Sequence, residues 1–148
     1  MISYGDKLLA STNLDIVLVS DTGNRDAWKR VPVTQQPSEY FQVFEGGEPD
    51  GFLEPGEYLT QLYCLAPWTA PDGTNGVYVG TNLKGLVYMT ENFEEWRPVF
   101  NTGEDRVHSL AAFGKYLFAG TSPKGRVYRW DGAQSELVHQ SRELGITA

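Results

Sequence analysis

The stretch TNLKGLVYMTEN, from Thr81 to Asn92, returns forty residues later as TSPKGRVYRWDG, from Thr121 to Gly132. Each copy follows a glycine and contains Lys-Gly, one variable residue and then Val-Tyr. Self-similarity at a fixed period of about 20 to 50 residues is typical of proteins built from repeated structural units. The spacing therefore predicts that the chain consists of repeats about forty residues long.

The repeats are expected to be made of strands. Short runs rich in Val, Leu, Tyr and Phe are separated by Gly, Asn, Asp and Pro, and no stretch keeps an apolar period of 3.6 residues for three turns. In the last repeat, strands are predicted at 106–113, 115–121, 125–130 and 135–140. In the middle repeat, they are predicted at 58–66, 76–81, 85–90 and 95–100.

Four short antiparallel strands in about forty residues have the size of one β-propeller blade. The chain is therefore predicted to be all-β, with blade 1 over about residues 1–33, blade 2 over 58–100 and blade 3 over 106–140. The first repeat matches the others only from its second strand onward, so blade 1 is expected to lack a first strand of its own. Residues 34–57, rich in Gly, Pro and acidic side chains, are expected to form a loop inserted between blades.

Two turns resemble a motif of known propellers. The runs from Ser20 to Trp28 and from Thr90 to Trp96 are similar to degenerate copies of the Asp-box turn, Ser-x-Asp-x-Gly-x-x-Trp, of sialidase-like and related propellers. The third repeat, with RWDGAQSEL, departs from that turn and is similar to a generic propeller blade. The resemblance implies an architecture and does not select one family.

Composition argues against several classes of partner. Twelve basic and nineteen acidic residues give a net charge of −7, and no local Lys/Arg cluster offsets it. Nucleic acid and anionic membranes are therefore not expected partners. No apolar run has the length of a membrane span or a signal peptide, so the sequence leaves the compartment undetermined.

The sequence supports no catalytic or metal chemistry. Cys64 is the only cysteine, and the two histidines, His108 and His139, lie on predicted strands without other metal ligands nearby, so neither a metal nor a cofactor is expected. The Gly-rich turns run into strands rather than helices, which excludes a phosphate-binding loop. Sialidases bind a sugar carboxylate through an arginine cluster, and only Arg106 could occupy such a place here. We therefore predict that the protein is not an enzyme.

Binding residues are expected on one face of the propeller. Loops from second to third strands share a face with the loops that join blades, and loops on a rigid scaffold often carry binding residues. The candidate residues for contact with a ligand or partner are Tyr40, Phe41, Asn82, Lys84, Glu104, Arg106, His108 and Lys124. Polar residues in turns are equally well explained by turn geometry alone.

The two ends of the sequence match one strand when they are joined. The last residues written before the first give ITAMISYGDKLLAST, which aligns without a gap with VHSLAAFGKYLFAGT at 107–121. Residues 145–148 are therefore expected to complete the first strand of a neighbouring blade. Three blades cannot close a ring, because propellers have about 4 to 8 blades. A two-fold homodimer with six blades would close it, and a larger ring or a fragment of a longer propeller are the alternatives.

These observations favour a non-enzymatic propeller that serves as a binding or assembly module for a protein or carbohydrate partner, for example as a structural component of a virus particle. The alternative is a sialidase-like or other glycan-cleaving propeller of reduced size, or a fragment of a longer propeller. Fold analogy does not decide between them, because propellers host both kinds of function.

Overall fold

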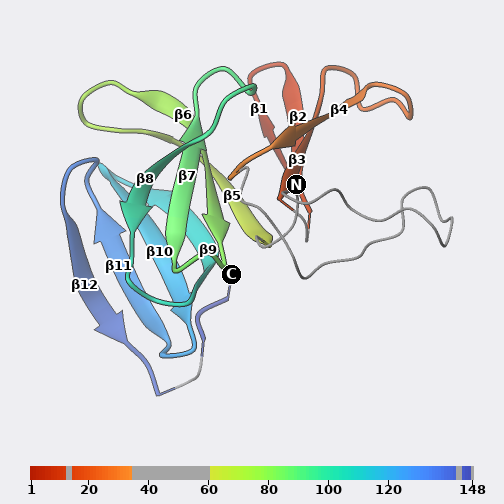
Figure 1. Cartoon of the computed structure of the whole chain (residues 1–148). Coiled ribbons are helices and arrows are strands. Elements are labelled where there is room, and N and C mark those ends of the chain that lie inside the picture. The colour runs from red at the N-terminus through yellow and green to blue at the C-terminus, as the bar shows by residue number, and fades with distance from the viewer. Residues whose placement is uncertain (13–14, 35–60, 143–144, 148) are drawn as a thin grey trace, which may run out of the picture.

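The computed structural model describes residues 1–12, 15–34, 61–142 and 145–147 of the chain. These residues form three four-stranded antiparallel sheets, and no helix occurs among them. In Figure 1 the three sheets follow one another in the order of the sequence, from red and orange through green to blue. The prediction of an all-β fold is confirmed. The described residues thus include no helix that is long and apolar enough to cross a membrane.

Each sheet is a series of hairpins, so strands that follow each other in the sequence are neighbours in the sheet. The first sheet contains β1 (Ile2–Tyr4), β2 (Lys7–Ser11), β3 (Ile16–Ser20) and β4 (Trp28–Pro32). The second contains β5 (Leu62–Thr69), β6 (Asn75–Thr81), β7 (Leu86–Thr90) and β8 (Arg97–Asn101). The third contains β9 (Arg106–Phe113), β10 (Tyr116–Ser122), β11 (Arg126–Trp130) and β12 (Ser135–Gln140).

The first repeat does have a first strand, contrary to the expectation from the sequence. The three-residue β1 pairs with β2 from Tyr4 opposite Lys7 to Ile2 opposite Leu9. Ile2 and Tyr4 form it because their side chains pack against the apolar cluster between the first and second sheets. β1 remains much shorter than β5 and β9, which have eight residues each.

The first strand of the second sheet extends further than predicted. β5 continues to Thr69, so Pro67 and Trp68 belong to the strand and not to the following turn. Trp68 is buried, with its ring 5.4 Å from those of Tyr78 and Trp130. β5 lies at the edge of its sheet, where a proline is tolerated, and the burial of Trp68 keeps the segment extended.

The threonine of the repeated Gly-Thr pair makes the same hydrogen bond in all three sheets. Its hydroxyl donates to the carbonyl of the first residue of the third strand, which ties the second strand to the third. The three bonds join Thr12 to Ile16 at 2.8 Å, Thr81 to Leu86 at 2.8 Å, and Thr121 to Arg126 at 3.0 Å. The first repeat therefore keeps this function of the motif although it has serine in place of the glycine.

The turns that resemble the Asp box are built alike in the first two sheets. The Ser20 hydroxyl accepts a hydrogen bond from the Gly23 amide, and the Thr90 hydroxyl accepts one from the Phe93 amide, each at 2.9 Å. Gly23 and Phe93 both have positive φ, at 72° and 61°. In the third sheet Asp131 stabilises the corresponding turn, since its carboxylate accepts hydrogen bonds from the backbone amides of Ala133 and Gln134.

The core lies between the sheets. One buried cluster joins the first sheet to the second and includes Leu9, Val17, Val31, Leu62, Val77 and Val79. A second cluster joins the second sheet to the third and includes Tyr78, Val87, Met89, Phe100, Val107, Leu117, Ala119 and Trp130. Each sheet is thus stabilised mainly by apolar surface that it buries against a neighbouring sheet.

Gly80 marks the point of closest approach between the second and third sheets. A Cβ atom at this position would lie 2.8 Å from both the Cγ1 atom and the carbonyl oxygen of Val107, and 2.7 Å from the Cys64 Sγ atom. These distances are shorter than van der Waals contact, so no larger residue fits without moving the backbone of β9. The glycine of the motif thus lets the first strand of the next sheet pack directly against it.

We predict that Gly80→Val destabilises the protein by at least about 2 kcal/mol, because it forces β9 away from β6. The measurement is urea unfolding followed by tryptophan fluorescence. As a control, Ala112→Val adds bulk at an exposed position of β9 and should change the free energy of unfolding by no more than about 0.5 kcal/mol. Equal stability of the two variants would show that the sheets do not meet at Gly80.

Candidate functional site

Three connections that carry predicted binding residues contact one another. The Gly85 amide, at the β6–β7 turn, donates to the Asp105 carbonyl at 3.2 Å, and the Thr102 amide donates to the Gly85 carbonyl at 3.1 Å. Glu104, between β8 and β9, reaches Lys124 in the β10–β11 turn. The prediction that these loops share one face is confirmed, and it brings together residues from the second and third sheets.

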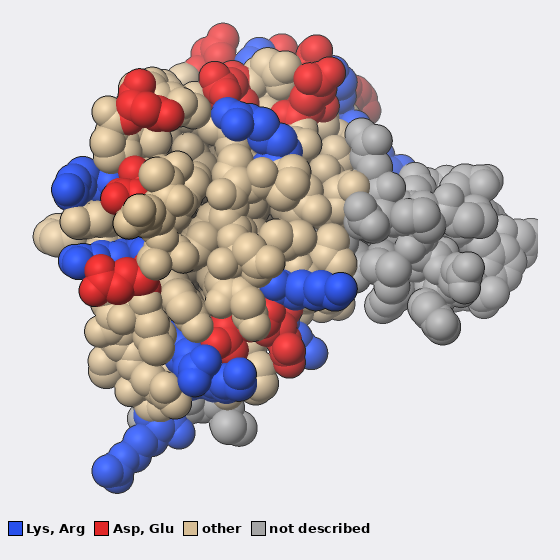
Figure 2. Space-filling view, turned by 60° about the vertical axis from the view of Figure 1, so that its left-hand side comes forward, with Lys and Arg blue, Asp and Glu red and all other residues tan. Residues whose placement is uncertain are grey.

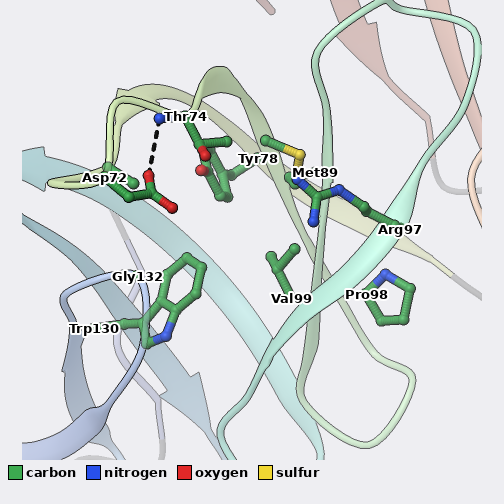
Figure 3. Close-up of a pocket in the computed structure, with 10 residues that line it drawn as sticks. Asp72, Thr74, Tyr78, Met89, Arg97, Pro98, Val99, Trp130 and Gly132 are labelled. Atoms are coloured by element: carbon green, nitrogen blue, oxygen red, sulfur yellow. Dashed lines mark hydrogen bonds between the residues drawn. The ribbon is translucent and has the colours of Figure 1, made fainter.

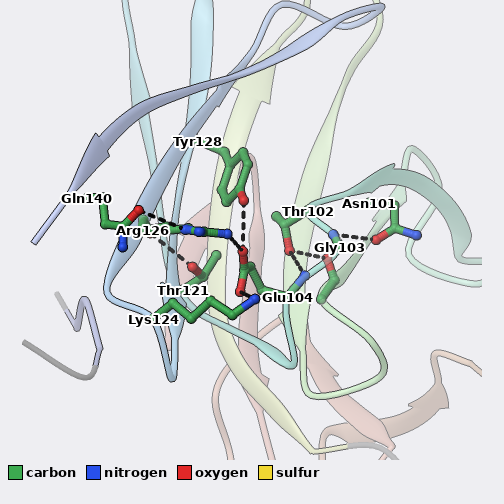
Figure 4. Close-up of polar contacts among 10 residues, drawn as sticks. Asn101, Thr102, Gly103, Glu104, Thr121, Lys124, Arg126, Tyr128 and Gln140 are labelled. Atoms are coloured by element: carbon green, nitrogen blue, oxygen red, sulfur yellow. Dashed lines mark hydrogen bonds and ion pairs between the residues drawn. The ribbon is translucent and has the colours of Figure 1, made fainter.

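Glu104 is the centre of this face (Figure 4). One of its carboxylate oxygens, Oε1, accepts hydrogen bonds from Arg126 at 2.7 Å and from the Tyr128 hydroxyl at 2.8 Å. The Lys124 ammonium lies 3.6 Å from the other, Oε2. The Glu104 side chain is only 3% exposed, so these contacts compensate a carboxylate that is removed from water.

The surroundings of Glu104 decide its charge. Burial by itself would raise the pKa, but the hydrogen bonds from Arg126 and Tyr128 and the charge of Lys124 outweigh it, so the pKa lies below its ordinary value. Glu104 is therefore ionised at neutral pH. An ionised carboxylate held by three partners acts as a structural link between the sheets, not as a proton donor.

The other predicted residues do not form one cavity. The Asn82 side chain accepts a hydrogen bond from the Gln61 amide at 2.8 Å, and Lys84 is exposed with a φ of 50°. Arg106 is exposed at the start of β9, and the His108 ring lies 4.4 Å from that of Tyr63. Burial, and then the charge of Arg106, lower the pKa of His108. Tyr40 and Phe41 lie outside the described residues.

A pocket of about 280 Å³ opens between the second and third sheets (Figure 3). Asp72 and Thr74 come from the β5–β6 turn, Arg97 from β8, and Trp130 from the end of β11. Asp72 and Arg97 stand on opposite sides of the opening in Figure 3, with Trp130 below them. Sequence reasoning missed this pocket, because its residues are far apart in the chain and match no motif.

The pocket offers hydrogen bonds but little catalytic chemistry. Hydrogen bonds from Thr74 lower the pKa of Asp72, so this carboxylate is ionised and a weak base. Arg97 is already paired with Glu91 at 2.9 Å. Elsewhere, burial raises the pKa of the Cys64 thiol to about 12, which keeps it protonated and unreactive. No group of three or more potential metal ligands occurs within residues 1–12, 15–34, 61–142 and 145–147.

Charged residues lie mainly around the edge of the face seen in Figure 2. The view brings forward the side of the molecule on which β12 lies in Figure 1, and uncharged residues form the centre of this face. Among the described large apolar side chains, Met1 and Phe113 are the most exposed, at 81% and 77%. The surface thus includes apolar positions that a fully covered sheet would bury.

The outer face of the first sheet has apolar residues where the other sheets bury theirs. Leu8, Ala10 and Leu18 are only partly buried. By strand register they correspond to Val77, Val79 and Tyr88 of the second sheet, all buried against the first sheet. They also correspond to Leu117 and Ala119 of the third sheet, which are fully buried.

The outer face of the third sheet, at the other end of the row of sheets, also has partly exposed apolar residues at positions that are buried in the other sheets. Phe118 and Val127 are partly exposed. Their counterparts Leu9 and Val17 are fully buried by the second sheet, and Tyr78 and Val87 are buried by the third. No fourth sheet covers either outer face in the part of the chain that the structure describes.

No protein-family model matches its sequence, no curated protein matches it, and no solved structure resembles its fold closely enough to count as a match.

Glu104→Gln should lower the free energy of unfolding by about 1 to 3 kcal/mol near pH 7, because Arg126 and Lys124 lose their buried carboxylate. The folded pKa lies below the unfolded value of about 4.3, so this stabilisation is present above that value and is lost as the pH falls through the folded pKa. Urea unfolding at neutral pH and near pH 3 should therefore show the two proteins converging in acid.

The matched control is Glu136→Gln, which removes the exposed partner of Arg129. It should cost less than about 1 kcal/mol, as exposed ion pairs do. Equal losses for the two variants, or a Glu104→Gln effect that does not change with pH, would contradict the assignment of Glu104 as an ionised link.

Proposed function

We propose that the protein is a non-enzymatic assembly module: its three sheets are propeller blades, and two copies close into a six-bladed ring. The observation that carries this proposal is the pair of partly exposed apolar faces at the two ends of the chain of sheets. The contacts between neighbouring sheets bury residues at these same positions, so each end lacks, within the described part of the chain, the neighbour that its sequence is suited to pack against.

A second copy supplies both missing neighbours. In a two-fold dimer the outer face of the third sheet, with Phe118 and Val127, packs against the outer face of the first sheet of the other copy, with Leu8, Ala10 and Leu18. The two-fold axis generates the same contact a second time. The pairing is apolar on both sides, like the two contacts within the chain. The ring would then have six blades, within the range of about 4 to 8 in which propellers close.

The charges on these faces are compatible with burial. Arg129, which lies on the outer face of the third sheet, is already paired with Glu136 at 2.8 Å and lies 4.7 Å from the centre of the Tyr116 ring. A guanidinium that is paired and stacked can be covered at lower cost than a free one. The contact therefore does not require the Arg129 guanidinium to leave water unpaired.

A glycan-cleaving propeller is less well supported. Glycoside hydrolysis usually needs two carboxyl groups, about 5 to 9.5 Å apart, on either side of the scissile bond. Asp72 is the carboxylate in the lining of the pocket between the second and third sheets, and the Glu104 carboxylate is held by Arg126 and Tyr128. The pocket is better suited to bind a small polar group than to cleave a glycan.

Light scattering after size exclusion should report twice the 16.5 kDa chain mass. Leu18→Glu should raise the dissociation constant of the dimer at least about tenfold, because it removes apolar surface from the contact and the ring would take a carboxylate out of water. Leu137→Glu, at a 44% exposed position of β12 outside the proposed contact, should leave the dimer intact. A folded monomer at micromolar concentration, unchanged by either substitution, would refute the proposal.

A further inference from the structure

We infer that the two copies share a strand: the segment that begins at Gly145 and contains Ile146 of one copy and residues 1–4 of the other together form the first strand of one blade. This inference rests on the proposed function and specifies how the ring closes. We place the contact with the second copy at the edge of β2 beyond Leu9, where β1 does not pair with β2, and Ile146 of the other copy lies at that edge.

Ile146 already occupies the place of a first-strand residue. Its amide donates to the Thr121 carbonyl at 3.1 Å, as the amide of Leu62, the first residue of β5, donates to the Thr12 carbonyl at 3.2 Å. Thr12 and Thr121 are equivalent, since both make the Gly-Thr hydrogen bond. Ile146 thus makes the same backbone hydrogen bond to the third sheet that Leu62 makes to the first sheet.

Side-chain contacts show that Ile146 occupies the same position beside the third sheet as Val107 of β9 occupies beside the second sheet. A Cβ atom on Gly80 would meet Val107, and a Cβ atom on the equivalent Gly120 would meet the Cγ2 and Cβ atoms of Ile146 at 2.7 and 2.9 Å. The Cys64 thiol lies 3.9 Å from the Val107 carbonyl, and the Ser109 hydroxyl, at the equivalent position, lies 3.3 Å from the Ile146 carbonyl. Three independent contacts therefore make Ile146 the start of a fourth first strand.

Among the described residues, β1 pairs with only part of β2. β1 covers β2 only from Lys7 to Leu9, whereas β5 pairs with β6 as far as Thr81 and β9 with β10 as far as Ser122. The positions that pair with Leu62 and Val107 are Thr81 and Thr121, which correspond to Thr12. Ile146 of the partner copy would therefore lie opposite Thr12 at this edge.

The two halves have the correct combined length. Tyr4 is equivalent to Phe113, since each precedes a turn with a glycine of φ near 58° and pairs with the residue three positions later. Six steps along the chain separate Val107 from Phe113, and six steps also lead from Ile146 through Ala148 and Met1 of the other copy to Tyr4. In the sequence as printed, the two segments therefore align with Val107–Phe113 in one register.

A tandem protein tests this register. Two copies are joined with Ala148 of the first directly followed by Met1 of the second, and a second tandem has one alanine inserted at the junction. One added residue turns the following side chains to the opposite face of the strand. The direct tandem should be a monomeric ring that melts at least about 3 °C above the tandem with the insertion.

Equal melting temperatures of the two tandems would overturn the shared strand, because a junction outside a strand tolerates one extra residue. Tandems that both associate into larger particles would overturn it as well, since the joined ends would then not be adjacent. The untethered chain separates this result from the proposed function. A dimer in light scattering with equally stable tandems would retain the two-copy ring and reject only the shared strand.

Discussion

Close apolar contact between neighbouring sheets is the interaction on which the rest of the structure depends. A sheet is a single layer and cannot bury its own two faces. The second sheet buries one face against the first sheet and the other face against the third sheet. Gly80 allows β9 to approach β6, and the hydroxyl of Thr81 fixes the turn beside that contact. The same rule leaves one face of the first sheet and one face of the third without a neighbour among the described residues.

Much of this arrangement could be predicted from the repeat. The period of forty residues predicted the four-stranded units, and the glycines of the Lys-Gly pair have the positive φ expected of a tight turn, 64° at Gly85 and 56° at Gly125. These features depend on neighbours in the chain or on backbone conformation. The structure shows why Gly80 and Gly120 recur in the motif, since a Cβ atom would meet Val107 of β9 at the first position and Ile146, which follows β12, at the second.

Other features could not be predicted because they depend on contacts between distant residues. Pro67 indicated a turn, yet Trp68 packs on Tyr78 and Trp130 and keeps β5 extended. Glu104 was expected to be a surface residue available to a ligand, but Arg126 and Tyr128 of β11, more than twenty residues further along the chain, donate hydrogen bonds to it. The opening lined by Asp72, Arg97 and Trp130 likewise combines three separate segments.

In the proposed ring, every sheet packs its apolar faces against neighbouring sheets, both within one copy and between the two copies. Its central claim is that Ile146 of one copy lies at the β2 edge of the other, and isotope-filtered NMR on a mixture of labelled and unlabelled chains tests it most directly. The account predicts intermolecular nuclear Overhauser effects between the methyl groups of Ile146 and the side chain of Thr12. Effects from Ile146 that arise only within one chain, at concentrations where the protein is fully associated, would contradict it.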